Sequence, residues 1–147
     1  MSLAGSLLGK PDLETGETTV IEPRTKDAGT RRVWSDSMGR LWVSEWNAGN
    51  LSRYDLVAKH WKVYHLPGAE PHAYAVYVDD RAMVWVSDFG ANAILRFDPQ
   101  AETFESFPSD REGAAVRQAL GRPGEMWGAE SGTDRLVAIR DAKEARN

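Results

Sequence analysis

Three acidic residues recur at a regular spacing in this 147-residue chain, and one histidine breaks the pattern. Glu45, Asp88 and Glu130 each follow a tryptophan by three positions, whereas His72 has no histidine counterpart one repeat before or after it. Carboxylates and an imidazole are the side chains that most often act as general acids and bases. Each also has a structural alternative. A repeated acid can accept backbone N–H bonds in a loop, and a lone histidine can be a hydrogen-bonding surface residue.

The elements that must position these residues form a repeat. The stretch 41–50 returns at 84–92, and a weaker copy surrounds the third tryptophan. Trp42 and Trp85 are 43 residues apart, and Trp127 follows 42 residues later. This period lies in the range of propeller blades. We expect the three tryptophans to form the core between neighbouring blades, because large apolar groups at one repeat position pack between sheets.

The alternation of apolar and polar residues between turn signals predicts an all-β chain with no helix. Each repeat contains four short strands, so we expect a β-propeller of four-stranded antiparallel blades, with about three blades per chain. Residues 7–140 form this single segment: two strands at 7–23, a blade at 32–67, a blade at 73–108 and a partial blade at 114–140. The turns between the first two strands of each blade fit ordinary turn chemistry. A polar tail follows at 141–147.

About three blades are too few for a closed ring, since propellers usually have four to eight. An open arc would leave sheet edges unpaired, which native proteins avoid. Either the sequence is a fragment of a longer protein, or a homodimer closes a six-bladed ring. The second alternative makes a second copy of the chain its partner, although one strand per chain does not fit that ring.

Strand direction alternates, so the loops between the second and third strands and the starts of the innermost strands lie on one face. Side chains there crowd the central channel, where we expect a small-molecule or peptide ligand. The candidate ligand-binding residues are Arg31, Arg32, Glu45, Trp46, Asn47, Phe89, Arg117 and Glu130. The arginine pair either holds an anionic ligand or forms salt bridges with Glu45 or Glu70.

Composition narrows the choice of partners. The chain is 41% hydrophobic and 27% charged, with a net charge of −4 and no cysteine. The acidic balance argues against nucleic acid and against an anionic membrane surface as partners. Without cysteine there is no disulfide framework and no thiolate site. The first ten residues contain no signal or membrane segment, so we expect a cytoplasmic location.

The repeated pattern at 42–53 and 85–96 resembles the blade repeat of the streptogramin B lyases, the virginiamycin B lyase family, within the broader NHL-like and gluconolactonase-like propellers. The resemblance covers roughly residues 7–140. Members of that family are longer and close a full propeller by themselves. The resemblance therefore implies that this chain matches about the C-terminal half of such a protein.

The resemblance also implies an activity. Those lyases use a divalent metal, usually magnesium, to open a cyclic depsipeptide by elimination at its ester. Glu70-Pro71-His72 matches the family's Glu-Pro-His tripeptide, which implies His72 as the catalytic base and Glu70 as a Mg²⁺ ligand. Asp88 lies near the place of the second metal carboxylate, whereas the family's second histidine falls at Arg32. The alternatives are a non-catalytic propeller that binds a small molecule or peptide, and a truncated gene product without activity.

Overall fold

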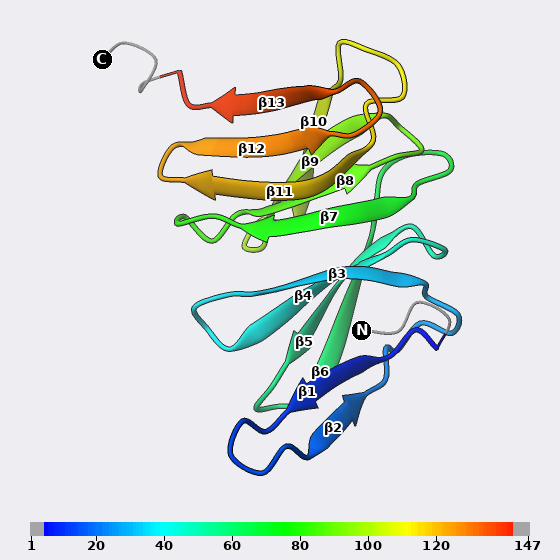
Figure 1. The fold of residues 1–147 in the computed structure, drawn as a ribbon, viewed down its shortest axis with the longest axis vertical. Helices are drawn as coiled ribbons and strands as arrows, with labels where there is room; N and C mark the ends of the chain where they lie inside the picture. Colours follow the sequence, from blue (N-terminus) through cyan, green and yellow to red (C-terminus); the bar gives the residue numbers. More distant parts are fainter. Residues whose placement is uncertain (1–4, 143–147) are drawn as a thin grey trace.

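The structure is a computed structural model that describes residues 5–142, so most of the polar tail predicted at 141–147 lies outside the described residues. These residues form thirteen strands in four antiparallel sheets, which are stacked in chain order along the long axis of the molecule (Figure 1). The all-β prediction is confirmed. None of the described residues belongs to a helix that could span a membrane.

Each sheet follows the order of its strands in the chain. The first sheet contains β1 (Leu8–Pro11) and β2 (Thr18–Ile21). The second contains β3 (Thr30–Ser35), β4 (Arg40–Glu45), β5 (Asn50–Asp55) and β6 (His60–His65). The third contains β7 (Ala73–Val78), β8 (Val84–Asp88), β9 (Ala93–Asp98) and β10 (Thr103–Pro108). The fourth contains β11 (Val116–Arg122), β12 (Glu125–Glu130) and β13 (Arg135–Arg140).

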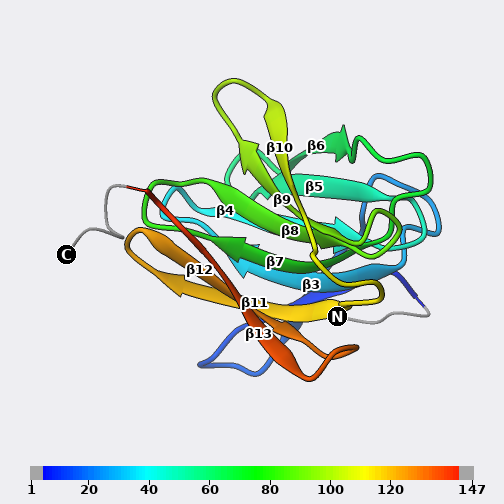
Figure 2. The ribbon, with the colours of Figure 1, turned by 90° about the horizontal axis from the view of Figure 1, so that it is seen from above.

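Figure 2 shows the innermost strands β3, β7 and β11 from above, and β7 contacts both of the others. Each carries a β-bulge near its start, and in β3 the bulge falls between Thr30 and Val33. A bulge bends a strand and re-aims its side chains. Thr30 already pairs with Glu45 before the bulge, so the strand begins at Thr30 rather than at the predicted residue 32.

A serine of the repeat holds two of these bulges and links neighbouring blades. The Ser44 hydroxyl accepts a hydrogen bond from the Arg32 N–H at 3.0 Å and donates to the Tyr74 carbonyl of the next sheet at 2.6 Å. Ser87 repeats the arrangement, accepting from the Ala75 N–H and donating to the Val116 carbonyl. Each serine therefore fixes the position of a bulge in its own blade relative to the innermost strand of the next blade.

The repeated tryptophans form the core between sheets at two of their three positions. Trp42 is fully buried and packs at 5.9 Å against Phe97 of the third sheet. Trp85 is buried in the cluster between the third and fourth sheets, with Val116 and Met126. Trp127 is only partly buried, because no further sheet covers it within the described residues. The prediction of an inter-blade core is confirmed for Trp42 and Trp85.

The turns at the other end of the blades contribute more than the expected turn chemistry. Asp36 accepts a hydrogen bond from the Trp42 indole N–H at 2.9 Å, and Asp79 accepts one from Trp85 at the same distance. Burial alone would raise the pKa of Asp36, but hydrogen bonds from Trp42 and Arg40 outweigh it, so the pKa lies below its ordinary value. These acids therefore fix the orientation of the inter-blade tryptophans.

Candidate functional site

Two arginines and a tyrosine occupy equivalent positions in the three innermost strands. Arg31, Tyr74 and Arg117 are each the second residue of their strand, 43 residues apart. The guanidinium carbon of Arg31 lies 5.6 Å from the Tyr74 ring centroid, and that of Arg117 lies 5.8 Å from it. Arg32 approaches the same ring to 5.1 Å. The three predicted arginines therefore converge on one aromatic ring.

Aromatic residues from the loops after β4 and β8 complete this cluster. Trp46 and Phe89 are again 43 residues apart, and their ring centroids lie 5.1 Å from each other. Phe89 stacks on Tyr74 at 5.0 Å, and Trp46 meets Tyr74 edge-on at 5.8 Å. The guanidinium carbons of Arg31, Arg32 and Arg117 all lie within cation–π distance of these rings.

His72 joins the cluster from the connection between β6 and β7. Its ring stacks on Trp46, with the centroids 4.8 Å apart and the planes 21° from parallel. The His72 Nδ1 lies 3.1 Å from the Trp46 carbonyl oxygen. Because a carbonyl oxygen can only accept, Nδ1 must carry the proton, which leaves Nε2 of the neutral ring with a free lone pair. In this arrangement, Nε2 is the ring nitrogen that can accept a proton.

The repeated acids are buried and engaged in holding their own loops. Glu45 is 0% exposed and accepts hydrogen bonds from the Asn50 amide at 2.8 Å and the Ser52 hydroxyl at 2.5 Å. Glu130 is 4% exposed and accepts from the Thr133 hydroxyl at 2.8 Å. Side chains, rather than the backbone N–H groups that we expected, donate to both carboxylates. Neither acid faces the arginine cluster with a free carboxylate.

Asp88 accepts the backbone bonds that the sequence led us to expect for a repeated acid. One carboxylate oxygen, Oδ1, accepts from the N–H groups of His72, Gly90 and Ala91 at 2.9, 2.9 and 3.3 Å. The other, Oδ2, is buried without a hydrogen-bond partner and faces Gly68. Asp88 therefore holds the His72 backbone in place, which makes it a support for the candidate base.

The two proposed Mg²⁺ ligands do not by themselves make a metal site. Mg²⁺ requires an octahedral set of oxygen ligands, usually with one or two carboxylates. Glu70 is exposed, while the carboxylate of Asp88 is buried and bonds to backbone N–H groups. Within residues 5–142, no group of three or more His, Asp or Glu side chains lies close enough together to hold a metal ion.

The remaining predicted residues occupy two different environments. Asn47 is exposed and donates its side-chain N–H to the Asp27 carbonyl at 3.1 Å, so it fastens the segment before β3. Arg31 and Arg32 form no ion pair with any residue in 5–142, so neither of the salt bridges considered from the sequence is formed. The structure therefore brings Arg31, Arg32, Trp46, His72, Phe89 and Arg117 together, and leaves Glu45, Asn47 and Glu130 in loop-holding positions.

Sequence reasoning missed Tyr74 and misplaced one equivalence. Tyr74 lies 43 residues from Arg31 and from Arg117, so the repeat period itself would have found it. The structure also identifies Gly29 as the residue equivalent to His72 in the preceding blade. The Trp46 N–H donates to the Gly29 carbonyl, just as the Phe89 N–H donates to that of His72. Arg32 therefore does not occupy the place of the family's second histidine.

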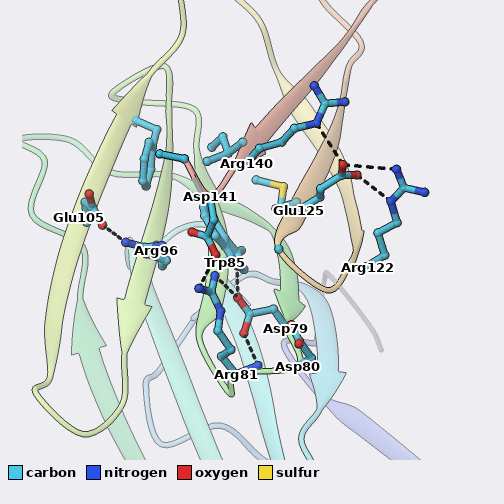
Figure 3. A pocket seen from close by; sticks show the side chains of 15 residues that line it. Asp79, Asp80, Arg81, Trp85, Arg96, Glu105, Arg122, Glu125, Arg140 and Asp141 are labelled. Atoms are coloured by element: carbon cyan, nitrogen blue, oxygen red, sulfur yellow. Dashed lines mark hydrogen bonds and ion pairs between the residues drawn. The ribbon is translucent and has the colours of Figure 1, made fainter. Parts of the chain in front are cut away.

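Away from this cluster, a concave region lies between the third and fourth sheets, near the turns that follow β7 and β11. This cavity of about 200 Å³ is smaller than most ligand pockets. Its charged side chains neutralise each other: Arg122 and Arg140 both point to Glu125, and Arg81 pairs with Asp141 (Figure 3). Hydrogen bonds from Arg122, Trp127 and Arg140 lower the pKa of Glu125 to about 2. We interpret this region as an inter-blade contact.

Solved structures with the same fold include two streptogramin-type lyases. Virginiamycin B lyase from Staphylococcus aureus, solved as a catalytically inactive variant with quinupristin, matches with a TM-score of 0.79 and 18% identity, over 97% of this chain and 51% of that one. A streptogramin B lyase matches with a TM-score of 0.80 and 16% identity, over 99% of this chain and 51% of its own. A Bacteroides uniformis protein proposed to be a 6-phosphogluconolactonase matches with a TM-score of 0.65 and 15% identity. The match covers 92% of this chain and 46% of that one.

These similarities establish a β-propeller fold and confirm the resemblance found in the blade repeat. The chain spans about half the length of the lyases it matches. No protein-family model matches the sequence, and no curated protein matches it.

Proposed function

We propose that this chain is part of a lyase-like propeller in which His72 acts as the general base of a ring-opening elimination. The substrate class is a cyclic ester or depsipeptide, which makes the reaction that of a carbon–oxygen lyase. The observation that carries the proposal is the hydrogen bond from His72 Nδ1 to the Trp46 carbonyl at 3.1 Å, which leaves Nε2 free to accept a proton. The fold shared with streptogramin B lyase supports the substrate class.

The proposed step balances without an added reactant. His72 Nε2 removes the proton from a carbon α to a carbonyl, and the electron pair left behind forms a carbon–carbon double bond. The bond between the β carbon and the ester oxygen breaks, so the ring opens and the oxygen departs in a carboxylate. Arg31 contacts the same tryptophan as His72, at 4.9 Å from the Trp46 centroid, and supplies positive charge near the site. No part of this step is assigned to a metal ion.

The purified chain is expected to open quinupristin, the compound held by the S. aureus lyase variant. Elimination adds no water, so the linear product has the mass of the starting ring, whereas hydrolysis would add the mass of one water. Liquid chromatography with mass spectrometry separates these outcomes. A retained ring, or a product heavier by one water, would contradict the proposal.

We also propose that a second copy of the chain closes the propeller. Each lyase is about twice as long as this chain, so two copies supply what one lyase contains. The outer face of the last sheet supports an interface, because Leu120 and Trp127 line an open groove there and Leu136 is 72% exposed. Sedimentation at micromolar concentration is expected to give the mass of two chains. A mass of one chain under the same conditions would contradict the dimer.

A second candidate function is non-catalytic binding of a small molecule or peptide on the same face. It is favoured by the burial of Glu45, Asp88 and Glu130, whose carboxylates are engaged in loop contacts. This function predicts that a ligand binds without being changed. The mass-spectrometric assay therefore separates the two candidates, because a binding protein returns the ring intact.

A further inference from the structure

Three positive charges lie on the channel face, the surface around Tyr74, Trp46 and His72, and no carboxylate of the described residues pairs with them. Arg31, Arg32 and Arg117 all lie within 6 Å of the Tyr74 ring centroid, measured from the guanidinium carbon. None of them forms an ion pair with the part of the chain that the structure describes. Three positive charges around one ring repel each other, so an anion that binds beside them is favoured.

The acids of the repeat do not act as that anion, since none of them forms an ion pair with these arginines. Glu45 and Glu130 accept hydrogen bonds from side chains of their own blades, and Asp88 Oδ1 accepts three backbone N–H bonds. What sets Arg31, Arg32 and Arg117 apart is that all three approach the same tyrosine ring without an ion-pair partner in residues 5–142. Their positive charge is therefore available to a ligand.

The donors of Arg31 give a second, independent sign. Its Nε is buried and has no hydrogen-bond acceptor, although a buried guanidinium N–H without a partner is unfavourable. The group is held instead by the rings of Trp46 and Tyr74, at 4.9 and 5.6 Å. Its terminal N–H groups form no hydrogen bond within residues 5–142, and because they are not buried they remain accessible. The rings of Trp46 and Tyr74 thus position the Arg31 guanidinium, and its terminal N–H groups can donate to a bound ligand.

We infer that Arg31, Arg32 and Arg117 form a binding site for the oxyanion group of a small molecule, a carboxylate or a phosphoryl group. Guanidinium groups pair with such oxyanions through charge-assisted and often bidentate hydrogen bonds. Because the rings of Trp46 and Tyr74 already hold Arg31 in place, little side-chain freedom is lost when an anion binds. The inference rests on the proposed ligand site of the channel face, but not on the elimination reaction.

The test compares benzoate and phenyl phosphate with benzamide, a neutral molecule of nearly the same shape as benzoate. Titration followed by NMR of the Trp indole N–H signals measures the dissociation constants. At least one anion is expected to bind about tenfold more tightly than benzamide, with affinity falling as salt is added. The stronger of the two anions identifies the preferred oxyanion.

The test variants and their control all replace an exposed arginine with glutamine. Arg32→Gln and Arg117→Gln are each expected to weaken binding of the preferred anion about tenfold or more, because each removes one charge-assisted interaction. Arg135→Gln, an equally exposed change on β13, should leave the affinity unchanged. Equal affinities for benzoate and benzamide, equal losses in all three variants, or no binding of either anion at millimolar concentration would overturn the inference.

The binding test and the elimination assay fail independently. Loss of anion binding in Arg32→Gln and Arg117→Gln, together with an intact quinupristin ring, would support the anion site and contradict the lyase. Ring opening by a chain that does not distinguish benzoate from benzamide would support the lyase and contradict the anion site.

Discussion

Replacing His72 with alanine is expected to slow the ring-opening reaction by about 10²–10⁴-fold, the usual contribution of a positioned general base. The physical reason is the geometry at Nε2, which becomes a free acceptor because Nδ1 donates to the Trp46 carbonyl. The measurement is the initial rate of formation of the linear product, followed by chromatography. Circular dichroism should show the same β structure as the unchanged chain. His72 is only partly buried, and it lies in a loop before β7 begins.

His60→Ala is the matched control for this prediction. His60 is exposed at the start of β6, a strand at the outer edge of its sheet, and lies outside the channel cluster. Its removal should leave the rate unchanged. Added imidazole should restore part of the activity of His72→Ala, because a free ring can enter the space beside Trp46. Equal rates for His72→Ala and His60→Ala would show that His72 is not the base.

Replacing Trp42 with alanine is expected to lower the free energy of unfolding by about 3–5 kcal/mol, the usual cost of removing a fully buried aromatic side chain. Trp42 is 0% exposed, contacts Tyr64 and Phe97, and donates its indole N–H to Asp36. The variant would leave a cavity between the second and third sheets and remove the indole donor that Asp36 now has. Urea denaturation followed by far-UV circular dichroism measures the change.

Trp127→Ala makes the same chemical change at the equivalent repeat position. Trp127 also donates its indole N–H to an acid, Glu125 at 2.8 Å, but no sheet covers it in the described part of the chain. We therefore expect a smaller cost, about 1 kcal/mol, when unfolding is measured at a concentration where the chain is monomeric. Equal costs for Trp42→Ala and Trp127→Ala would contradict the view that only the inner positions are inter-blade core.

Most of the fold followed from local patterns in the sequence. The two strands predicted at 7–23 are β1 and β2, and their turn is formed locally: Asp12 Oδ1 accepts the N–H groups of Glu14 and Thr15, and Gly16 has φ 75°. Strand alternation and turn chemistry act within a few residues, so they can be read directly. The inter-blade role of Trp42 and Trp85 followed from their equivalent places in the 43-residue repeat.

The candidate site could be predicted only in part. The face shared by Arg31, Trp46 and His72 followed from strand direction, but the stacking of Trp46 on His72 and the gathering of three arginines around Tyr74 did not. The roles of the acids were also ambiguous. The sequence pattern is the same whether a carboxylate beside a loop faces the channel or binds the backbone. Asp88 does the second, because it accepts the N–H groups of His72 and Gly90 from two loops.

The sequence by itself determined the blade repeat, the all-β class, the pairing order within each sheet and the likeness to the lyase propellers, because these depend on side-chain patterns within about 43 residues. The tertiary structure alone decided which polar residues share a surface. Bulges held by Ser44 and Ser87 set how Arg31 and Tyr74 project from their strands, and contacts between separate blades then bring them together. Such contacts join residues far apart in the chain, so no local pattern encodes them.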